Sequence, residues 1–476
     1  MTVQVYDSKL RAVVPLQTRD EGRVAMYCCG PTVYNYIHIG NARTFVWFDA
    51  IRRYLAYRGY DVTYVMNYTD VDDKIIERAN VEGIPPDGVT KKYERAFEDD
   101  MAALGASPAD IVCRATDHIR LMVEAIEGLV ANGLAYEAGG DVFFAVEKFD
   151  GYGSLSGRSL DDMRAGERIE PHEHKRHPLD FALWKSAKEG EPSWPSPWGP
   201  GRPGWHIECS VMSTKYLGMG FDVHGGASDL IFPHHENELA QAEGLAGTEP
   251  FVRHWLHAGL VQIDAEKMSK SLGNFVLAHD LVQRFDSEAI RYWMLAGSYR
   301  TQASFTDAAL EDAASSYGRW KTFVESARHA LGDDMPPPAD ARRPVAETPP
   351  DEYAAAFVAA MDDDFNSAGA FAVVHDLVKA GNRLLADVQG GGDKGDLSAL
   401  VATFQELTGV LGFRFPAAAE VSGILEGLLD FLLEMRAEAR AEKAYERSDA
   451  IRDRLASLGV TIEDTPAGPR WRVGGH

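Results

Sequence analysis

Residues 23–66 read RVAMYCCGPTVYNYIHIGNARTFVWFDAIRRYLAYRGYDVTYVM, and this stretch decides the fold class. Residues 23–28 have the pattern of a buried strand, residues 30–31 form a Gly-Pro turn, and residues 42–55 place apolar side chains at helical spacing. A second strand follows at 62–66. The order strand, helix, strand predicts a parallel βαβ unit, which binds ligands at the carboxyl ends of its strands.

The pattern outward from this unit predicts several domains, because 476 residues are too many for one hydrophobic core. A second α/β stretch at about 204–262 follows a helical and turn-rich segment, so the first fold is interpreted as interrupted by an insertion at about 115–203. Beyond about 310 the pattern is helical, broken by prolines within 335–350. A long helix at 424–458 and two strand-like pieces then predict a small terminal module.

We therefore expect an α/β domain at 1–310, whose last region, at about 263–310, contains Lys267 and Lys270. A helical bundle at 311–420 and an α/β module at 421–476 follow it.

Composition narrows the function classes. No apolar run approaches the ~18 residues of a membrane span, and the first residues lack the layout of a secretory signal, so we expect a cytoplasmic protein. The net charge of −24 argues against a protein that coats nucleic acid through a general basic field. Residues 436–476 carry eight Lys and Arg against seven Asp and Glu, a net of +1, and are the least repulsive place for a polyanion.

Two separated stretches suggest phosphate chemistry. His38, Gly40 and Asn41 lie between the first strand and the first helix, where backbone N–H groups favour an anion and a glycine lets a flat base approach. Far downstream, Lys267 and Lys270 belong to a small polar loop that could neutralise charge developing on pyrophosphate. Each stretch alone also fits an ordinary solvated loop.

A third group is rich in metal ligands. His234 and Glu238 are four residues apart and would share one face of a helix. Together with Cys209 and either Cys28 or Cys29, they make two thiolates, one imidazole and one carboxylate, a set that suits zinc. From spacing alone, other members could be chosen equally well: His206, His235 and Glu236.

The two phosphate motifs, in this order, resemble the HIGH and KMSKS signatures of class I aminoacyl-tRNA synthetases, with Asn41 in place of the second histidine. Five further segments resemble the cysteinyl-tRNA synthetase family: 29–34, 67–74, 204–210, 232–238 and 361–366. This resemblance covers nearly the whole chain. It implies a Rossmann-like class I catalytic domain with an insertion, a helical tRNA-binding bundle and a terminal anticodon-binding module.

The resemblance also implies roles for individual residues. A substrate cysteine can ligate zinc as thiolate, whereas the serine hydroxyl is a far poorer ligand, so the metal would provide discrimination. Ala227 stands where many relatives have glycine. The implied sets are as follows: zinc on Cys29, Cys209, His234 and Glu238; the substrate cysteine near Cys29, Thr69, Trp205 and His234; ATP near His38, Gly40, Asn41, His224, Gly226, Asp229 and Lys270; catalysis by His38, Asn41, Lys267 and Lys270; and anticodon contacts from Arg440, Asp449, Asp464 and Trp471.

The expected activity is ATP-dependent activation of L-cysteine and its transfer to tRNA(Cys) by a monomer that holds one Zn²⁺ and receives Mg²⁺ with ATP. Two alternatives stay open: a cysteine ligase of mycothiol biosynthesis, which lacks the terminal module, and a non-catalytic RNA-binding paralogue. The terminal stretch and the intact lysine loop favour the first reading.

Overall fold

The computed structural model describes residues 2–160, 174–263, 266–267, 276–337, 351–415, 418–442, 444–457, 460–465 and 468–473. The chain divides into two compact units, Met1–Arg414 and Phe415–His476. No helix in the described ranges is long and apolar enough to cross a membrane.

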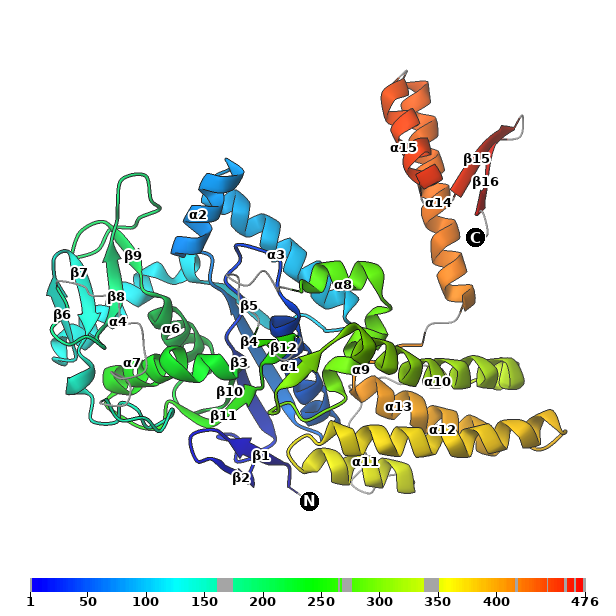
Figure 1. Ribbon diagram of the computed structural model, residues 1–476, viewed down its shortest axis with the longest axis horizontal. Helices are drawn as coiled ribbons and strands as arrows, with labels where there is room; N and C mark the ends of the chain where they lie inside the picture. The colour runs from blue at the N-terminus through cyan, green and yellow to red at the C-terminus, as the bar shows by residue number, and fades with distance from the viewer. Residues whose placement is uncertain are drawn as a thin grey trace. The chain divides into compact units, whose positions relative to one another are not determined.

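A five-stranded parallel sheet lies at the centre of the first unit (Figure 1). Its spatial order is β11-β10-β3-β4-β5, so the chain builds outward from β3 in one direction and then from β10 in the other. Ligands bind at such a switch point, outside the carboxyl ends of the strands. This confirms the predicted α/β fold. The strands are β3 (Arg23–Cys28), β4 (Asp61–Tyr68), β5 (Ile111–Arg114), β10 (Phe221–Ala227) and β11 (Val252–Ala258).

Helix α1 (Ile39–Tyr57) makes the crossover from β3 to β4, as the sequence predicts. It begins three residues earlier than the predicted start at 42, because Nδ1 of His38 accepts the backbone N–H of Asn41 and caps the helix. Its first turn therefore lies at the carboxyl end of β3, where the phosphate motif is expected.

The insertion between β5 and β10 holds a structure that the sequence pattern did not predict. A four-stranded antiparallel sheet, in the order β6-β7-β8-β9, packs with α4 (Ile119–Ala131). Its strands are only three to six residues long, too short for a clear alternation of apolar and polar residues. They are β6 (Ala135–Ala138), β7 (Asp141–Phe144), β8 (Phe181–Ser186) and β9 (Gly201–Pro203).

Helix α6 (Trp205–Leu217) returns the chain from the insertion to the central sheet and precedes β10. Helix α7 (Glu236–Ala246) connects the last two strands of that sheet, β10 and β11, through a short π-helical turn, Ile231–His235. The other elements around the sheet are β1 (Gln4–Asp7), β2 (Ala12–Pro15), α2 (Asp73–Glu82), α3 (Pro86–Ala103), β12 (Val261–Ile263), β13 (Glu266–Lys267), α8 (Ala278–Arg284), α9 (Ser287–Leu295) and β14 (Ala303–Phe305).

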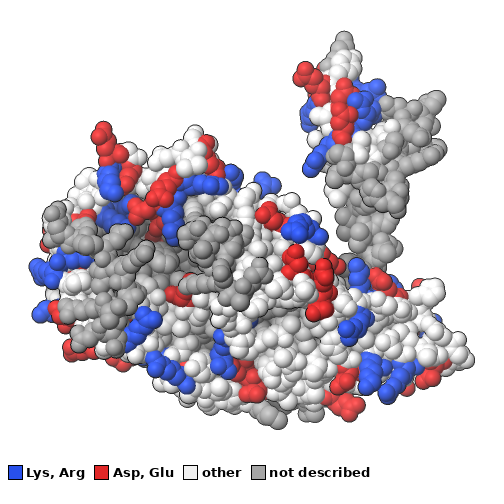
Figure 2. Space-filling model, viewed as in Figure 1, with Lys and Arg blue, Asp and Glu red and all other residues white. Residues whose placement is uncertain are grey.

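The helical region beyond 310 belongs to the first compact unit. It comprises α10 (Asp307–Leu331), α11 (Glu352–Asp362), α12 (Ser367–Gln389) and α13 (Gly395–Val410). Asp362 attaches the bundle to α1 by accepting hydrogen bonds from Tyr54 Oη at 2.6 Å and Arg58 Nε at 2.9 Å. The visible face of this unit carries acidic and basic side chains intermixed (Figure 2), rather than one basic coat.

The second unit contains α14 (Ala418–Ala441), α15 (Tyr445–Ser457) and the antiparallel pair β15 (Val460–Thr465) and β16 (Gly468–Val473). The prediction of one helix over 424–458 is wrong, because the chain folds back after α14. This reversal lets Leu429 pack against Leu455 and Val460, which one straight helix would leave exposed. The two strand-like terminal pieces are confirmed as strands.

Candidate functional site

A cleft of about 260 Å³ opens at the switch point of the central sheet, beyond the carboxyl ends of β3, β4 and β10. Its walls come from segments more than 200 residues apart in the sequence. Eight residues predicted from the sequence line it together: Cys29, His38, Asn41, Thr69, Trp205, Cys209, Asp229 and His234.

The expected metal ligands converge at the inner end of this cleft. One ligand atom from each of Cys29, Cys209, His234 and Glu238 lies within 4.8 Å of the other three, and all four residues are buried. Cys29 Sγ is 3.3 Å and His234 Nε2 is 3.0 Å from the same carboxylate oxygen, Oε1 of Glu238. Two sulfurs, one imidazole nitrogen and one carboxylate oxygen in this space fit a tetrahedral zinc site.

Charge within this group is also suited to a cation. Burial lowers the pKa of His234, but the charges and hydrogen bonds of Glu238 and Cys209 together outweigh it and raise the value to about 10. Burial would raise the pKa of Cys209, but hydrogen bonds from Cys29 and His234 lower it to about 6. The Cys209 thiolate and the Glu238 carboxylate are therefore the anions of the group, and a divalent metal bound there would take the place of the proton on His234.

A second possible ligand set shares two members with the first: Cys29, His224, His235 and Glu238. Its histidines are completely buried and do not line the cleft. His224 Nε2 lies 2.8 Å from Glu238 Oε2, and His235 Nδ1 lies 2.8 Å from His257 Nε2. A substrate entering the cleft can therefore reach the first set but not these two histidines. The prediction that His224 contacts ATP is not supported, because its side chain is bonded to Glu238 instead of facing the cleft.

The residues expected around the substrate cysteine lie beside the first set. Trp205 stacks on His234 with ring centroids 4.1 Å apart and is 37% exposed, so one face of its indole remains open to the cleft. Thr69 donates its hydroxyl proton to Oε2 of the buried Glu208 at 2.8 Å. This leaves the Thr69 oxygen available as an acceptor for a bound amino acid.

At the other end of the cleft, a smaller cavity of about 70 Å³ is lined by Gly40 and residues 259–261, and His38, Asn41 and Asp229 line both cavities. Gly226 lies in β10 and lines neither cavity. The predicted nucleotide residues of α1 thus face the segment that follows β11.

The lysine loop is anchored to both walls of this cavity. Lys267 belongs to β13, which pairs with β12 directly after the 259–261 segment. On the far side, Ile39 N–H donates to Val276 O at 2.9 Å, so the chain returns against the first turn of α1. The predicted residue Lys270 lies outside the described residues.

The predicted anticodon residues belong to the second unit. Arg440 and Asp449 are exposed on α14 and α15, and Oδ1 of Asp449 lies 3.0 Å from Nη1 of Arg452. Asp464 and Trp471 lie in the paired strands β15 and β16. The paired strands and two helices place all four residues in one small module.

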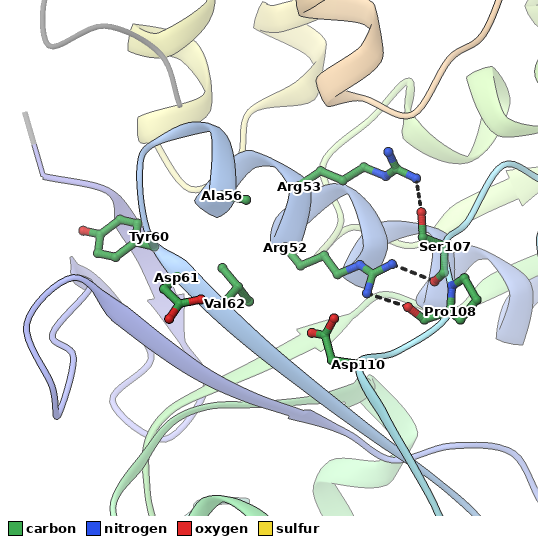
Figure 3. A pocket seen from close by; sticks show the side chains of 9 residues that line it. All are labelled: Arg52, Arg53, Ala56, Tyr60, Asp61, Val62, Ser107, Pro108 and Asp110. Atoms are coloured by element: carbon green, nitrogen blue, oxygen red, sulfur yellow. Dashed lines mark hydrogen bonds between the residues drawn. The ribbon is translucent and has the colours of Figure 1, made fainter. Parts of the chain in front are cut away.

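Another cavity, of about 530 Å³, lies at the opposite, amino end of β4 (Figure 3). Its two arginines face the 107–110 segment, where Arg52 donates to Ser107 O and Pro108 O at 2.7 and 2.8 Å. Arg53 Nη2 donates to the Ser107 hydroxyl at 2.6 Å. These arginine donors are already bonded to the protein's own oxygen atoms. The cleft at the carboxyl ends of the strands is therefore the better candidate site.

Sequence reasoning missed Asn67, which supports the metal ligands. Its Oδ1 accepts the Gly30 backbone N–H at 2.9 Å and lies 3.6 Å from Cys209 Sγ. It thereby connects the backbone next to Cys29 to the second thiol. The signal available was its position at the start of the 67–74 segment, two residues before Thr69.

Comparison with known proteins agrees with this geometry. Residues 15–315 match the model of the class I (C) tRNA synthetase catalytic domain, residues 356–416 the DALR domain, and residues 427–472 the cysteinyl-tRNA ligase anticodon binding domain. The fold resembles that of methionyl-tRNA synthetase from Mycobacterium tuberculosis, at a TM-score of 0.57 and 15% identity over 82% of this chain and 89% of that one.

Curated relatives are much more similar in sequence. The cysteine–tRNA ligase of Desulfitobacterium hafniense is 50% identical over 99% of this chain and all of its own length. That of Halalkalibacterium halodurans is 48% identical over the full length of both chains.

The parallel sheet, the cleft at its switch point and the matched catalytic domain define a class I aminoacyl-tRNA synthetase. Within that class, the full-length relatives and the matched terminal domain show that the chain belongs to the cysteine–tRNA ligase family, whose members are ligases that charge tRNA. The mycothiol ligase and the non-catalytic paralogue are not favoured.

Proposed function

We propose that the cleft activates L-cysteine with ATP and that the cysteinyl group is then transferred to the 3′ end of tRNA(Cys). One observation carries this proposal. The four ligand atoms of Cys29, Cys209, His234 and Glu238 lie within 4.8 Å of one another, and all of these residues except the fully buried Glu238 line a cleft that is also lined by His38 and Asn41. An amino-acid subsite and a nucleotide subsite therefore share one continuous space.

In the amino-acid subsite, we assign one Zn²⁺ to Cys29, Cys209, His234 and Glu238, a donor set that suits this metal. Bound zinc would supply a Lewis-acid position for the substrate thiolate, which serine cannot occupy as well. The exposed face of Trp205 would pack along the short side chain, and the oxygen of Thr69 would accept from the substrate ammonium group. Both contacts favour a small amino acid with a free amino group.

In the nucleotide subsite, the amino end of α1 offers backbone donors and a positive dipole end to the phosphates of Mg²⁺-ATP. His38 caps this helix through Nδ1, so its Nε2 edge is directed away from the cap, where it could donate to phosphate oxygen. Asn41 can donate but cannot carry charge, so we assign charge neutralisation on pyrophosphate to His38, Lys267 and Lys270. Gly40 and Asp229 would contact the nucleoside.

For the tRNA, we assign acceptor-side binding to the helical bundle at 311–420 and anticodon binding to the module at 421–476, following the catalytic domain at 1–310. Arg440, Asp449, Asp464 and Trp471 are the proposed base contacts, since charged groups read base edges and an indole can stack on an unpaired base. All the proposed active-site residues come from one chain, so a monomer suffices, and a tRNA substrate points to the cytoplasm.

The test is cysteine-dependent ATP–pyrophosphate exchange, followed by acylation of total tRNA with labelled cysteine. We expect both reactions. Exchange without acylation would favour transfer of cysteine to another acceptor, and absence of exchange from a folded, metal-loaded chain would refute the proposal.

The metal assignment is tested with Cys209→Ser, His235→Gln and the control Cys113→Ser. Cys113 is a buried thiol of the same core that belongs to neither ligand set. We expect about one zinc per chain in the wild type and in the Cys113 and His235 variants, and almost none in Cys209→Ser, by metal analysis of the folded proteins. Zinc loss in His235→Gln with retention in Cys209→Ser would instead assign the second set.

A further inference from the structure

Arg43 lies one turn into α1, directly after the phosphate motif, and is only 2% exposed. Its guanidinium bridges two chain segments that are far away in the sequence. Nη1 donates to Gly259 O at 2.8 Å, and Nη2 donates to Ser298 O at 3.0 Å. One turn later, Trp47 Nε1 donates to Met294 O at 2.9 Å. One face of α1 is thus fixed to the segments that follow β11 and α9.

The segment clamped by Arg43 forms the wall of the smaller cavity. Residues 259–261 line that cavity opposite His38, Gly40 and Asn41. Gly259 N–H donates to Tyr299 O at 2.7 Å, and a Cβ at this position would lie 2.3 Å from Thr301 O. Gly259 is thus bonded to the 298–301 segment through its N–H and packs closely against it, while its carbonyl is bonded to Arg43 of α1. The two hydrogen bonds of Arg43 span the distance between α1 and these two segments.

The free-energy cost of burying the Arg43 guanidinium indicates that this side chain has a role beyond filling volume. A buried guanidinium is expensive without a charged partner, and no carboxylate within ion-pair distance of Arg43 is found in the described part of the chain. Its Nε also lacks a hydrogen-bond partner there. Burial lowers the pKa of Arg43 to about 10. An apolar residue of similar length would fill the volume without this cost, but it could not hold two carbonyls at a fixed spacing.

We propose that Arg43 is a positioning residue for the nucleotide, which sets the width of the ATP cavity by holding the 259–261 wall against the first turns of α1. This inference rests on the proposed function, because it takes the cavity as the seat of the nucleoside. It assigns no chemical step to Arg43. The residue acts through Gly259 and Ser298, and cysteine binding at the other end of the cleft should not depend on it.

The test uses Arg43→Lys and Arg43→Met in cysteine-dependent ATP–pyrophosphate exchange, with KM measured separately for ATP and for cysteine. Lysine keeps the charge but lacks the fork that reaches both carbonyls, and methionine removes both donors. We expect KM for ATP to rise about tenfold in Arg43→Lys and more in Arg43→Met, with KM for cysteine within twofold of the wild type. Direct titration with a non-hydrolysable ATP analogue, in the absence of cysteine, should show the same weakening.

The matched control is Arg291→Lys. Arg291 is also completely buried and also donates to two carbonyls, Leu411 O and Leu104 O, but it lines neither cavity. The Arg291→Lys variant should have a lower melting temperature than the wild type and an unchanged KM for ATP. If Arg43→Met fails to fold, Arg43→Lys still decides the question. An unchanged KM for ATP in the folded Arg43→Lys variant, or an equal rise in both KM values, would overturn the inference. A wild type without exchange activity would instead remove the proposed function itself.

Discussion

Asp364 offers the sharpest test of how the bundle is attached to the catalytic core. It lies between α11 and α12 with a positive φ of 54° and is 8% exposed. Its Oδ1 accepts Tyr6 N–H at 2.7 Å and the Tyr299 hydroxyl at 2.9 Å, and its Oδ2 accepts Arg300 Nε at 2.6 Å. One carboxylate therefore joins the bundle to β1 and to the segment after α9.

The expected effect of Asp364→Ala follows from these contacts. Two donors, Tyr6 N–H and the completely buried Tyr299 hydroxyl, would lose their partner, at about 1–3 kcal/mol each. The Arg300 side chain is 38% exposed and would be hydrated in the variant, so loss of its ion pair with Asp364 adds little to the destabilisation. The positive φ itself adds little to the difference, because aspartate and alanine both place a Cβ there and aspartate is only modestly better tolerated. We expect the free energy of unfolding of the first unit to fall by about 3–5 kcal/mol.

The assay is urea unfolding followed by far-ultraviolet circular dichroism and tryptophan fluorescence. Asp363→Ala is the matched control, because Asp363 is the adjacent, exposed aspartate and should change stability by less than about 0.5 kcal/mol. Asp364→Asn keeps one acceptor oxygen for Tyr6 N–H and the Tyr299 hydroxyl, loses the acceptor for the partly exposed Arg300 and tolerates the backbone conformation, so it should lose only about 1–2 kcal/mol. The reasoning is wrong if Asp364→Ala lies within about 1 kcal/mol of the wild type, or if Asp363→Ala is equally destabilising.

Three other outcomes are expected. Burial raises the pKa of Glu288 from 4.5 to about 7, so its neutral form is favoured in the fold, and its contribution to stability is lost as the pH rises from about 4.5 to 7. Glu288→Gln should therefore gain stability relative to the wild type across that window, by up to about 3 kcal/mol, in urea titrations at pH 5 and pH 8. Chelation of the metal should abolish cysteine-dependent exchange and lower the thermal midpoint, with zinc restoring both; full activity in a chain shown by metal analysis to be zinc-free would contradict this. In Gly30→Ala the new Cβ would lie 1.6 Å from Asn67 O, so zinc content and solubility should fall, whereas Gly318→Ala, in open space on α10, should stabilise by about 0.5–1 kcal/mol.

Local patterns predicted the central fold well, since β3, α1 and β4 each repeat one period over enough residues to be recognised. The short insertion strands were missed, and α14 and α15 were merged, because their separation into two packed helices depends on contacts between distant leucines rather than on a local stop signal. Local sequence is a weak guide wherever tertiary contacts decide the element.

In the candidate site, too, local spacing predicted some contacts, and tertiary packing decided the others. The spacing of His234 and Glu238 predicted one shared face, and the two side chains do meet at 3.0 Å. Spacing could not choose between Cys28 and Cys29, because successive residues of a strand point to opposite sides and only the sheet order decides which side faces α7. The hydrogen bond between His224 and Glu238 could not be predicted from the sequence either, because it depends on how β10 packs against α7.

The ligand set has a consequence for how the protein is made. Cys29 and Glu238 are 209 residues apart, and the insertion is synthesised between them. At about 5–20 residues per second, a ribosome needs roughly 10–40 s to pass from one to the other. During that time the nascent chain has the first half of the sheet but one ligand of four, so metal capture must follow translation of α7. Under the proposed zinc assignment, a chain released earlier would lack ligands of the site, so its zinc content would report whether translation had passed Glu238.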